Sequence, residues 1–459
     1  MKKILLLNPP GKQYYMRDYY CSKISKAAYY YHPIDFIILT GILAGDFKVH
    51  VLDCIAEKLT EEIALSEIIK IKPDTIIFLT GAVSMQSDFP FLENVKHKTD
   101  SQMIGIGDIF LDFGRDLLNN NDFIDAILLD FTTNDIIEFL KDKDSSFRNI
   151  IYKDGDSIME RGENHQAGTF SIPLPRHELF KNEKYIFPFS KNKKFSTVMT
   201  DFGCPFKCSY CVVNRFNYKE REIASVIEEL GSLNKIGIQE IVFKDQAFAV
   251  NRDRAKLLCE EISKNKIKIS WTCFSRVDLI DRDLLFLMKK AGCHTIIFGI
   301  ESSNQNLLSE YNRHINHQMA KETFSLCKQF GIETVGTFII GLPKDTKESI
   351  KRTIAFSKNL GCDYASFNIF TPAYGTQIRE KLINNRIIDG KMRFMDSGIS
   401  YPTVETEFLK CKDIWSLKKQ AILSFYIRPR YYLKRIRKIH SLLEITNALR
   451  QAIGLLKNL

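Results

Sequence analysis

The sequence lacks long hydrophobic runs. None of its 459 residues belongs to an uninterrupted apolar run of eighteen or more, which argues against a membrane-spanning helix. The apolar run at residues 4–7 is too short for the core of a signal peptide, and there is no internal repeat or low-complexity segment. With 45% apolar and 26% charged residues, the composition excludes a disordered or collagen-like chain. We therefore expect a globular cytoplasmic protein.

Acidic residues are scarce at one end of the chain only. Residues 400–459 contain twelve Lys and Arg against four Asp and Glu, whereas the other 399 residues contain 53 and 51. The net charge of +10 therefore belongs mostly to this tail. Because the rest of the chain is almost neutral, we expect no nucleic acid partner.

The eleven cysteines are an odd number in a chain without an export signal, so we expect reduced thiols. Eight are scattered in apolar segments and are expected to be small buried residues. The other three, Cys204, Cys208 and Cys211, share one loop with C-x-x-x-C-x-x-C spacing. Three thiolates can hold three irons of a [4Fe-4S] cluster and leave the fourth open. Zinc is the competing interpretation, but structural zinc normally has four ligands and no nearby Cys or His supplies a tidy fourth.

Two alternations of short apolar runs with amphipathic stretches predict an α/β protein. In the first, we expect strands over residues 3–8, 48–53, 75–79, 102–106 and 126–129, and helices over 34–44, 61–71 and 89–96. This order predicts a doubly wound, Rossmann-like parallel sheet over residues 1–144. Residues 145–194, which contain three prolines and show little periodicity, are predicted to be a linker.

The second alternation predicts a barrel. We expect strands over residues 195–200, 240–244, 268–272, 295–300, 333–340 and 364–370, the first five each followed by a helical pattern. Six such units within residues 195–399 indicate a full or partial barrel with its chemistry at the carboxyl ends of the strands. Residues 400–459 are predicted to be a basic helical extension.

The cysteine loop GCPFKCSYC, at the end of the first barrel strand, resembles the cluster loop of the radical S-adenosylmethionine (SAM) superfamily. Tyr210, the aromatic residue before the last cysteine, fits the same pattern. The resemblance implies a partial (β/α)6 TIM-like barrel in which SAM occupies the open iron. It also implies cleavage of SAM to methionine and a 5′-deoxyadenosyl radical, and an electron donor such as flavodoxin or ferredoxin.

Later strand ends extend this resemblance over residues 195–380. The segments VFKDQAF, FSRVD, FGIES and GTFIIGLP supply the positions that the resemblance assigns to SAM, namely Asp245, Gln246, Arg276, Glu301 and Gly341. A guanidinium can fork onto a carboxylate, and a glycine permits close backbone approach. The structural alternatives are an ion pair between Arg276 and Glu301 and a helix-capping role for Asp245. In FTPAYGT, Tyr374 stands where the family usually has proline.

The segments ILLLNPP, HPIDFIILTGILAG and VHVLD resemble the cobalamin-binding domain fused to one branch of radical SAM enzymes. Because open α/β sheets bind ligands at the carboxyl ends of their strands, we expect Ser84, Gln86, Gly105 and Gly107 to face cobalamin. Ordinary turn geometry is the alternative for the glycines. The D-x-H-x-x-G motif that supplies a histidine to cobalt in many cobalamin proteins is absent, as it is in many members of this branch.

The resemblance implies cobalamin-dependent methylation of an unactivated carbon in a lipid or secondary metabolite. The deoxyadenosyl radical would remove hydrogen, methylcobalamin would donate the methyl group, and a second SAM would remethylate the cobalt. The first alternative is a radical SAM cyclase, rearrangement or oxidation enzyme without methyl transfer. The second is a non-catalytic iron–sulfur protein that senses cobalamin.

The C-terminal stretch reads as two amphipathic helices with basic flanks. Leu433 and Ile436 begin one apolar stripe, and Leu442, Ile445 and Leu449 belong to another. A basic amphipathic helix can lie on an anionic membrane, which would suit a lipid or isoprenoid substrate and a place at the inner membrane face. The alternative is that the apolar stripes pack onto the barrel.

Overall fold

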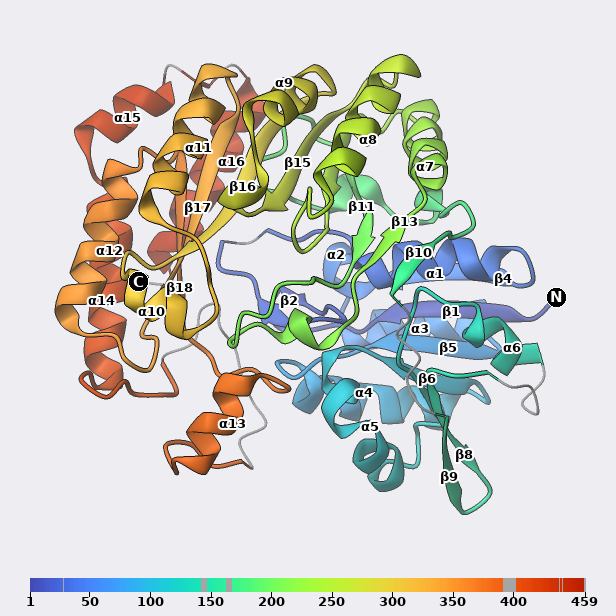
Figure 1. Cartoon of the computed structure of the whole chain (residues 1–459). Helices are drawn as coiled ribbons and strands as arrows, with labels where there is room; N and C mark the ends of the chain where they lie inside the picture. The colour runs from blue at the N-terminus through green and yellow to red at the C-terminus, as the bar shows by residue number, and fades with distance from the viewer. Residues whose placement is uncertain are drawn as a thin grey trace. The chain divides into compact units, whose positions relative to one another are not determined.

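A computed structural model describes residues 1–27, 29–141, 147–161, 167–390, 402–436, 438–439 and 441–457 (Figure 1). The chain forms two compact units. The N-terminal unit comprises Met1–Ser25, Tyr29–Ile186 and Lys219–Glu229. The barrel unit comprises Lys26–Ala28, Phe187–Tyr218 and Leu230–Leu459. The boundaries expected near residues 144 and 399 fall at stretches outside the described residues.

The N-terminal unit is built on a seven-stranded sheet of order β4-β1-β5-β6-β7-β8-β9. The first five strands in this order pair in parallel, and the last two add an antiparallel hairpin edge. The strands are β1 (Lys3–Asn8), β4 (Lys48–Asp53), β5 (Thr75–Leu79), β6 (Gln102–Ile106), β7 (Ala126–Leu128), β8 (Ile150–Asp154) and β9 (Ser157–Arg161). The predicted Rossmann-like sheet is confirmed.

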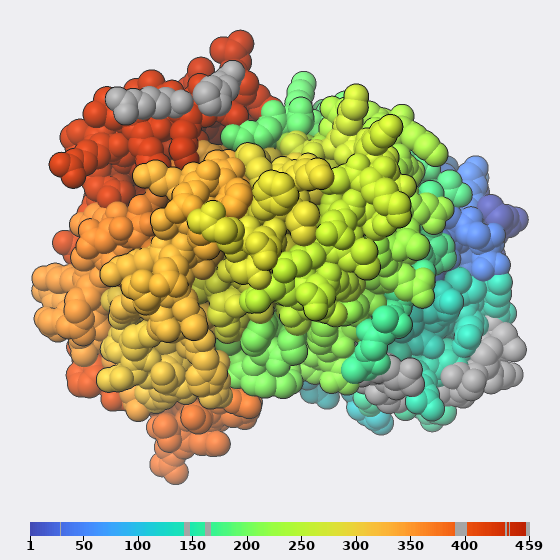
Figure 2. Space-filling view, turned by 45° about the horizontal axis from the view of Figure 1, so that its top comes forward, coloured from blue at the N-terminus to red at the C-terminus, as the bar shows by residue number. Residues whose placement is uncertain are grey.

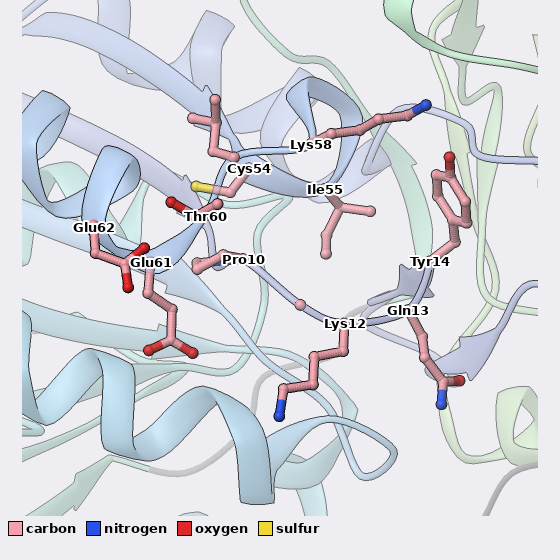
Figure 3. Close-up of a pocket in the computed structure, with 12 residues that line it drawn as sticks. Pro10, Lys12, Gln13, Tyr14, Cys54, Ile55, Lys58, Thr60, Glu61 and Glu62 are labelled. Atoms are coloured by element: carbon pink, nitrogen blue, oxygen red, sulfur yellow. The ribbon is translucent and has the colours of Figure 1, made fainter.

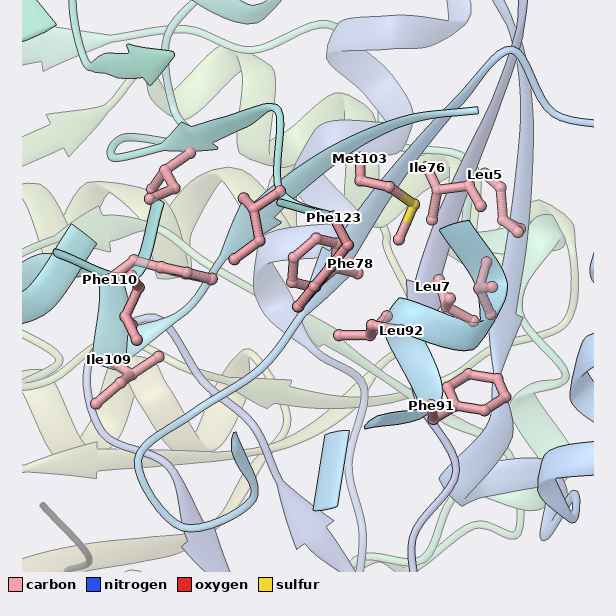
Figure 4. Packing of buried hydrophobic residues seen from close by; sticks show 14 of the residues in the cluster. Leu5, Leu7, Ile76, Phe78, Phe91, Leu92, Met103, Ile109, Phe110 and Phe123 are labelled. Atoms are coloured by element: carbon pink, nitrogen blue, oxygen red, sulfur yellow. The ribbon is translucent and has the colours of Figure 1, made fainter. Parts of the chain in front are cut away.

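Buried strands explain why this sheet carries helices. Every residue of β5 is buried, as are five of the six residues of β1, so both faces of these strands need cover. The helices are α1 (Ile34–Ala44), α2 (Cys54–Glu57), α3 (Glu61–Ile71), α4 (Met85–Lys98), α5 (Asp108–Asn120) and α6 (Asp135–Lys141). Figure 4 shows part of the resulting core, in which the ring centroids of Phe110 and Phe123 lie 6.1 and 6.2 Å from that of Phe78.

The N-terminal unit also contains short elements outside the seven-stranded sheet, some of them from later in the chain. Within it lie β2 (Tyr15–Met16), β3 (Lys23–Ile24), β10 (Gly168–Phe170), β13 (Lys219–Arg221), η1 (His177–Leu179) and η2 (Asn182–Lys184). Strand β13 pairs in parallel with β10. Glu229 is buried, forms an ion pair with Arg221 and is hydrogen-bonded to Nε2 of His177 at 2.6 Å. The stretch expected to be a linker therefore supplies strands and buried polar contacts to this unit.

The barrel unit contains six parallel strands in sequential order, β11-β14-β15-β16-β17-β18. The strands are β11 (Phe195–Val198), β14 (Glu240–Phe243), β15 (Ser270–Ser275), β16 (Cys293–Glu301), β17 (Glu333–Ile340) and β18 (Tyr364–Ile369), with a short β12 (Asp201–Phe202). Sequential parallel neighbours require a crossover between each pair. The predicted partial (β/α)6 barrel is confirmed.

Helices and short 3-10 turns connect and flank these strands. They are η3 (Val212–Arg215), α7 (Ile223–Lys235), α8 (Arg252–Lys264), η4 (Val277–Leu279), α9 (Arg282–Lys290), α10 (Gln305–Glu310), α11 (His317–Gln329), α12 (Lys347–Asn359), α13 (Gln377–Asn384), α14 (Cys411–Tyr426), α15 (Pro429–Ile436) and α16 (Leu442–Lys457). The expected C-terminal helical extension is thus present as α14 to α16. No helix in the described part of the chain is long and apolar enough to cross a membrane.

Candidate functional site

The three clustered cysteines lie on a loop that begins just after β12, at the carboxyl end of β11. Gly203 adopts φ +76°, and a Cβ there would lie 2.5 Å from the carbonyl oxygen of Asn217. Only glycine fits such a backbone without strain. The middle of the loop is fixed from two sides, because the Ser209 amide donates to Tyr311 (3.0 Å) and the Ser209 carbonyl accepts from Ile378 (3.1 Å). The cysteines are thus held at a defined place.

Burial sets the electrostatics of the thiols. It raises the pKa of Cys204, and it raises the pKa of Cys211 to about 12. The negative charge of each neighbouring thiolate raises both values further, so the three sulfurs are close enough to repel one another when ionised. Buried thiols this close together ionise when they bind a metal, because coordination to a metal deprotonates a thiol outright. This donor set therefore fits an iron–sulfur cluster held by Cys204, Cys208 and Cys211.

Two buried arginines flank the Cys208 sulfur. Nη1 of Arg276 lies 4.0 Å from Sγ of Cys208, and Nη1 of Arg313 lies 3.9 Å from it. Arg276 stacks over Phe206, with Cζ 3.7 Å from the ring centroid, and forms an ion pair with Asp278 at 2.8 Å. Arg276 therefore pairs with Asp278 and not with Glu301, the ion-pair partner that the sequence offered as an alternative.

Sequence reasoning missed Arg313, which precedes α11 and is only 7% exposed. Its Nη2 donates to the Gly299 carbonyl at 2.5 Å, and its buried Nε has no hydrogen-bond partner among the residues that the structure describes. A buried cation beside sulfur ligands lowers the energy of negative charge there. Arg313 is thus a second positive charge at the cluster loop.

Glu301 ends β16 in a left-handed backbone conformation, with φ +66°. Such a conformation is strained for a residue with a Cβ. Burial raises the pKa of Glu301, and the nearby Arg313 and Arg276 partly offset this effect. A Cβ on Gly299 would lie 2.5 Å from Oε1 of Glu301 and 2.8 Å from Nη2 of Arg313. The glycine of FGIES therefore makes room for both side chains.

The other residues expected at SAM have structural contacts. Both carboxylate oxygens of Asp245 accept hydrogen bonds, from the Thr200 hydroxyl (2.7 Å) and from the Thr200 and Asp201 amides (2.6 and 3.0 Å). Asp245 therefore ties β14 to the start of the cluster loop. It does not cap the next helix, because the N-cap of α8 is Asn251. Gln246 is half-buried beside it.

Tyr210 packs against a small apolar cluster, and Gly341 directly precedes Leu342, a member of that cluster. Tyr210 also meets Tyr311 edge-on, with ring centroids 6.3 Å apart. Burial raises the pKa of Tyr210 well above its ordinary value, so its hydroxyl stays protonated. Gly341 adopts φ +86° and donates its amide to Asp345 at 3.2 Å. The turn after β17 therefore requires a glycine at this position.

At the carboxyl edge of the N-terminal sheet, Ser84 belongs to a buried polar network. Its hydroxyl donates to Asp88 (2.6 Å) and accepts from Nε of Arg17 (3.0 Å). Arg17 and Asp88 form an ion pair at 2.5 Å whose side chains are fully buried. Thr80, at the end of β5, also donates to Asp88, at 2.7 Å. The network joins β2 to the loops that follow β5.

The remaining residues expected at cobalamin differ in exposure. Gln86 is exposed on the first turn of α4. A Cβ on Gly105 would lie 2.5 Å from the Phe110 ring, and a Cβ on Gly107 would lie 1.8 Å from the Thr80 carbonyl oxygen. Gly107 also has φ +132°. Both glycines are thus needed for packing, and the positive φ of Gly107 also fits the ordinary turn geometry that the sequence left open.

The same sheet edge holds a pocket of about 610 Å³ that sequence reasoning missed (Figure 3). It lies beyond the carboxyl ends of β1 and β4 and is lined by Pro10, Gly11, Lys12, Gln13, Tyr14, Cys54, Ile55, Lys58, Leu59, Thr60, Glu61 and Glu62. Pockets of this size commonly hold cofactors, and this edge is where open α/β sheets bind them. The pocket therefore fits part of a bulky cofactor.

Fold and site together define an α/β barrel enzyme with an iron–sulfur loop at the barrel's active end. The family model that matches the chain is "Radical SAM superfamily", over residues 200–357. A curated relative from Pyrococcus horikoshii is 30% identical over 93% of this chain and 93% of its own length. The chain belongs to the radical SAM superfamily, which uses a [4Fe-4S] cluster and SAM.

The named relatives and structures are similar over nearly the whole chain. The Pyrococcus horikoshii protein is described as an uncharacterized methyltransferase. The radical SAM methyltransferase TsrM from Kitasatospora setae, solved with cobalamin and a [4Fe-4S] cluster, has a TM-score of 0.66 and 18% identity, covering 84% of this chain and 75% of TsrM. The cobalamin-dependent radical enzyme OxsB has a TM-score of 0.69 and 14% identity, covering 99% of this chain and 72% of OxsB. The two structures share the fold.

Proposed function

We propose that the protein is a cobalamin-dependent radical SAM methyltransferase that acts on a carbon atom of a small molecule. The observation that carries the proposal is the pairing, in one chain, of a three-cysteine loop at the barrel mouth with a Rossmann-like sheet that has a pocket at its carboxyl edge. The similarity to TsrM, which binds both cofactors, and to a relative described as a methyltransferase supports it.

When bound, the cluster supplies the electron that cleaves SAM, and cobalamin supplies the methyl group. The protein's part is to bind, orient and exclude water. Cys204, Cys208 and Cys211 would hold the cluster. Arg276 and Glu301, at the ends of β15 and β16, are the proposed contacts of SAM, and Gly299 gives Glu301 the space to reach it. Asp245 acts indirectly, because its contacts are with the loop itself.

The test is anaerobic turnover of the reconstituted enzyme with SAM that carries an isotope label in its methyl group. We expect the label in the product, and two SAM molecules consumed for each methyl transferred. One of them would yield 5′-deoxyadenosine and the other S-adenosylhomocysteine. Release of 5′-deoxyadenosine with an unlabelled product would favour the cyclase, rearrangement or oxidation alternative. Binding of cobalamin without any SAM cleavage would favour a sensor.

Arg313 provides a prediction about the cluster itself. In Arg313→Gln, one positive charge beside Cys208 is lost, so adding an electron to the cluster becomes less favourable. We expect its midpoint potential to fall by roughly 50 to 150 mV, measured by redox titration followed by electron paramagnetic resonance. Arg313→Lys, which keeps the charge, should stay close to the wild type, and so should Arg252→Gln on the exposed start of α8. An unchanged potential in Arg313→Gln would contradict this role.

The substrate class and partners are finer proposals. A lipid, isoprenoid or other secondary metabolite fits the type of reaction proposed. An electron donor such as flavodoxin or ferredoxin would reduce the cluster, and contact of the C-terminal helices with a membrane surface would bring the enzyme to a lipid substrate.

A further inference from the structure

Helix α15 is turned so that Lys434 and Arg435 face the barrel unit, whereas Leu433 and Ile436 face outward. Arg435 pairs with Glu333 at 2.6 Å, and Lys434 pairs with Asp363 at 3.0 Å. Arg435 also stacks over Tyr364, with Cζ 4.3 Å from the ring centroid. The basic residues that a sequence pattern places around an apolar stripe are therefore used to dock the helix.

Helix α16 is turned in the same way. Its inward side is polar or small: Glu444 pairs with Lys191 (3.1 Å), Gln451 donates to the Pro188 carbonyl (3.0 Å), and a Cβ on Gly454 would lie 2.6 Å from Cα of Ala27. Asn447, between them, is buried. These residues recur at helical spacing and define one face, and Leu443 and Leu455 at its margins are half-buried.

The outward faces are apolar. The large aliphatic side chains exposed on the two helices are Leu433 (59%), Ile436 (68%), Leu442 (81%), Ile445 (41%), Leu449 (57%) and Ile453 (54%). The four on α16 follow the i, i+3, i+7, i+11 pattern of a single helix face. These six side chains therefore do not pack onto the barrel, whereas Ile439 and Leu443, which continue the first predicted stripe, are half-buried. We name these six residues the outward stripe; Figure 2 shows the C-terminal segment, in red, at the surface.

We propose that the outward stripe is a membrane-docking surface that inserts into the interface of a bilayer containing anionic lipids. This inference deepens the membrane contact proposed above, but it does not depend on which reaction the enzyme performs. Apolar helix faces of this kind lie at the boundary between headgroups and acyl chains. We expect the apolar side chains of the outward stripe to contribute most of the free energy of membrane binding, and the basic residues beside the stripe to contribute the rest.

The charges beside the outward stripe favour an anionic membrane as its partner, rather than a second copy of the chain. Arg430 on α15 and Arg450 on α16 are exposed beside the outward stripe. Within the described residues of these two helices the one carboxylate is Glu444, which is turned inward. Two copies of the stripe would therefore bring like charges together, whereas anionic headgroups complement them.

The experiment is flotation of the full-length protein with vesicles, with and without about one quarter phosphatidylglycerol in phosphatidylcholine. We expect binding to both, stronger on anionic vesicles. Ile445→Ser with Leu449→Ser should lower the partition coefficient by about tenfold or more. The matched control is Ile236→Ser with Leu257→Ser, because these side chains are similarly exposed (44% and 47%) but lie elsewhere. We expect no change in the control.

Further readouts separate this inference from the proposed reaction. Both variants should retain wild-type circular dichroism, bound iron and SAM cleavage in solution, so a loss of vesicle binding alone supports the docking surface. Three results would overturn it: no binding of the wild type to either vesicle, equal binding of Ile445→Ser/Leu449→Ser and the wild type, or a vesicle-free dimer that this variant abolishes. A second variant, Leu433→Ser with Ile436→Ser, tests the α15 part independently.

Discussion

Cys208→Ala should abolish the chemistry while leaving the fold intact. Loss of one of three thiolates leaves two ligands for a four-iron cluster, which is too few for stable binding. We expect bound iron and sulfide to fall close to background and SAM cleavage to fall by at least about a thousandfold. The measurements are iron content, the visible absorption spectrum and 5′-deoxyadenosine production after anaerobic reconstitution.

A cysteine elsewhere provides the control for this experiment. Cys411 is half-buried at the start of α14, so Cys411→Ala should keep full iron content and activity. Cys204→Ala and Cys211→Ala should behave as Cys208→Ala does. Normal iron content in any of these three variants, or zinc in place of iron in the anaerobic wild type, would contradict the cluster assignment.

Asp88→Ala should strongly destabilise the N-terminal unit. It would leave Arg17 as an unpaired cation with a fully buried side chain, and breaking a buried ion pair in this way costs about 3–5 kcal/mol. We expect amide protection in β1 and β5 to fall by about a hundredfold or more, measured by hydrogen exchange on the full-length protein. The destabilisation would arise because Asp88 belongs to the buried polar network that contains Ser84.

An exposed pair gives the matching control. Lys70 and Glu67 form an i,i+3 pair at 2.7 Å whose side chains are 66% and 43% exposed. Because solvent screens such pairs, Glu67→Ala should change the free energy of unfolding by less than about 0.5 kcal/mol. Equal effects of Asp88→Ala and Glu67→Ala would show that the buried pair has no special importance.

Periodicity predicted much of the fold. The strands at residues 3–8, 48–53, 75–79 and 102–106, and the helices at 34–44 and 61–71, match the structure in both bounds. At 3–8, 75–79 and 102–106 the reason is that apolar runs mark strands buried on two faces. Helix α5 was missed, since its interior Gly114 has low helix propensity and the preceding IGIG was taken for a cofactor loop. The hairpin β8–β9 was also missed, although Asp154 and Gly155 carry a hairpin signal.

The site was predictable only where chemistry is local in sequence. The three cysteines share one loop, so their spacing singled them out, whereas Arg276 and Glu301 stand at strand ends and were assigned through the family resemblance. Arg313 follows no strand end; it reaches Cys208 because the chain after α10 folds back toward the cluster loop. For Gly105 and Gly107 the sequence is ambiguous, because the same glycine pattern serves close packing as well as ligand approach.

The N-terminal unit takes residues 219–229 from beyond the cluster loop, and there Glu229 meets His177 and Arg221. A break in the gene anywhere between codons 187 and 218 would thus separate His177 from Glu229 and strand β10 from its partner β13. A single crossover there would therefore exchange the barrel unit together with one strand of the N-terminal unit, and never the barrel unit by itself.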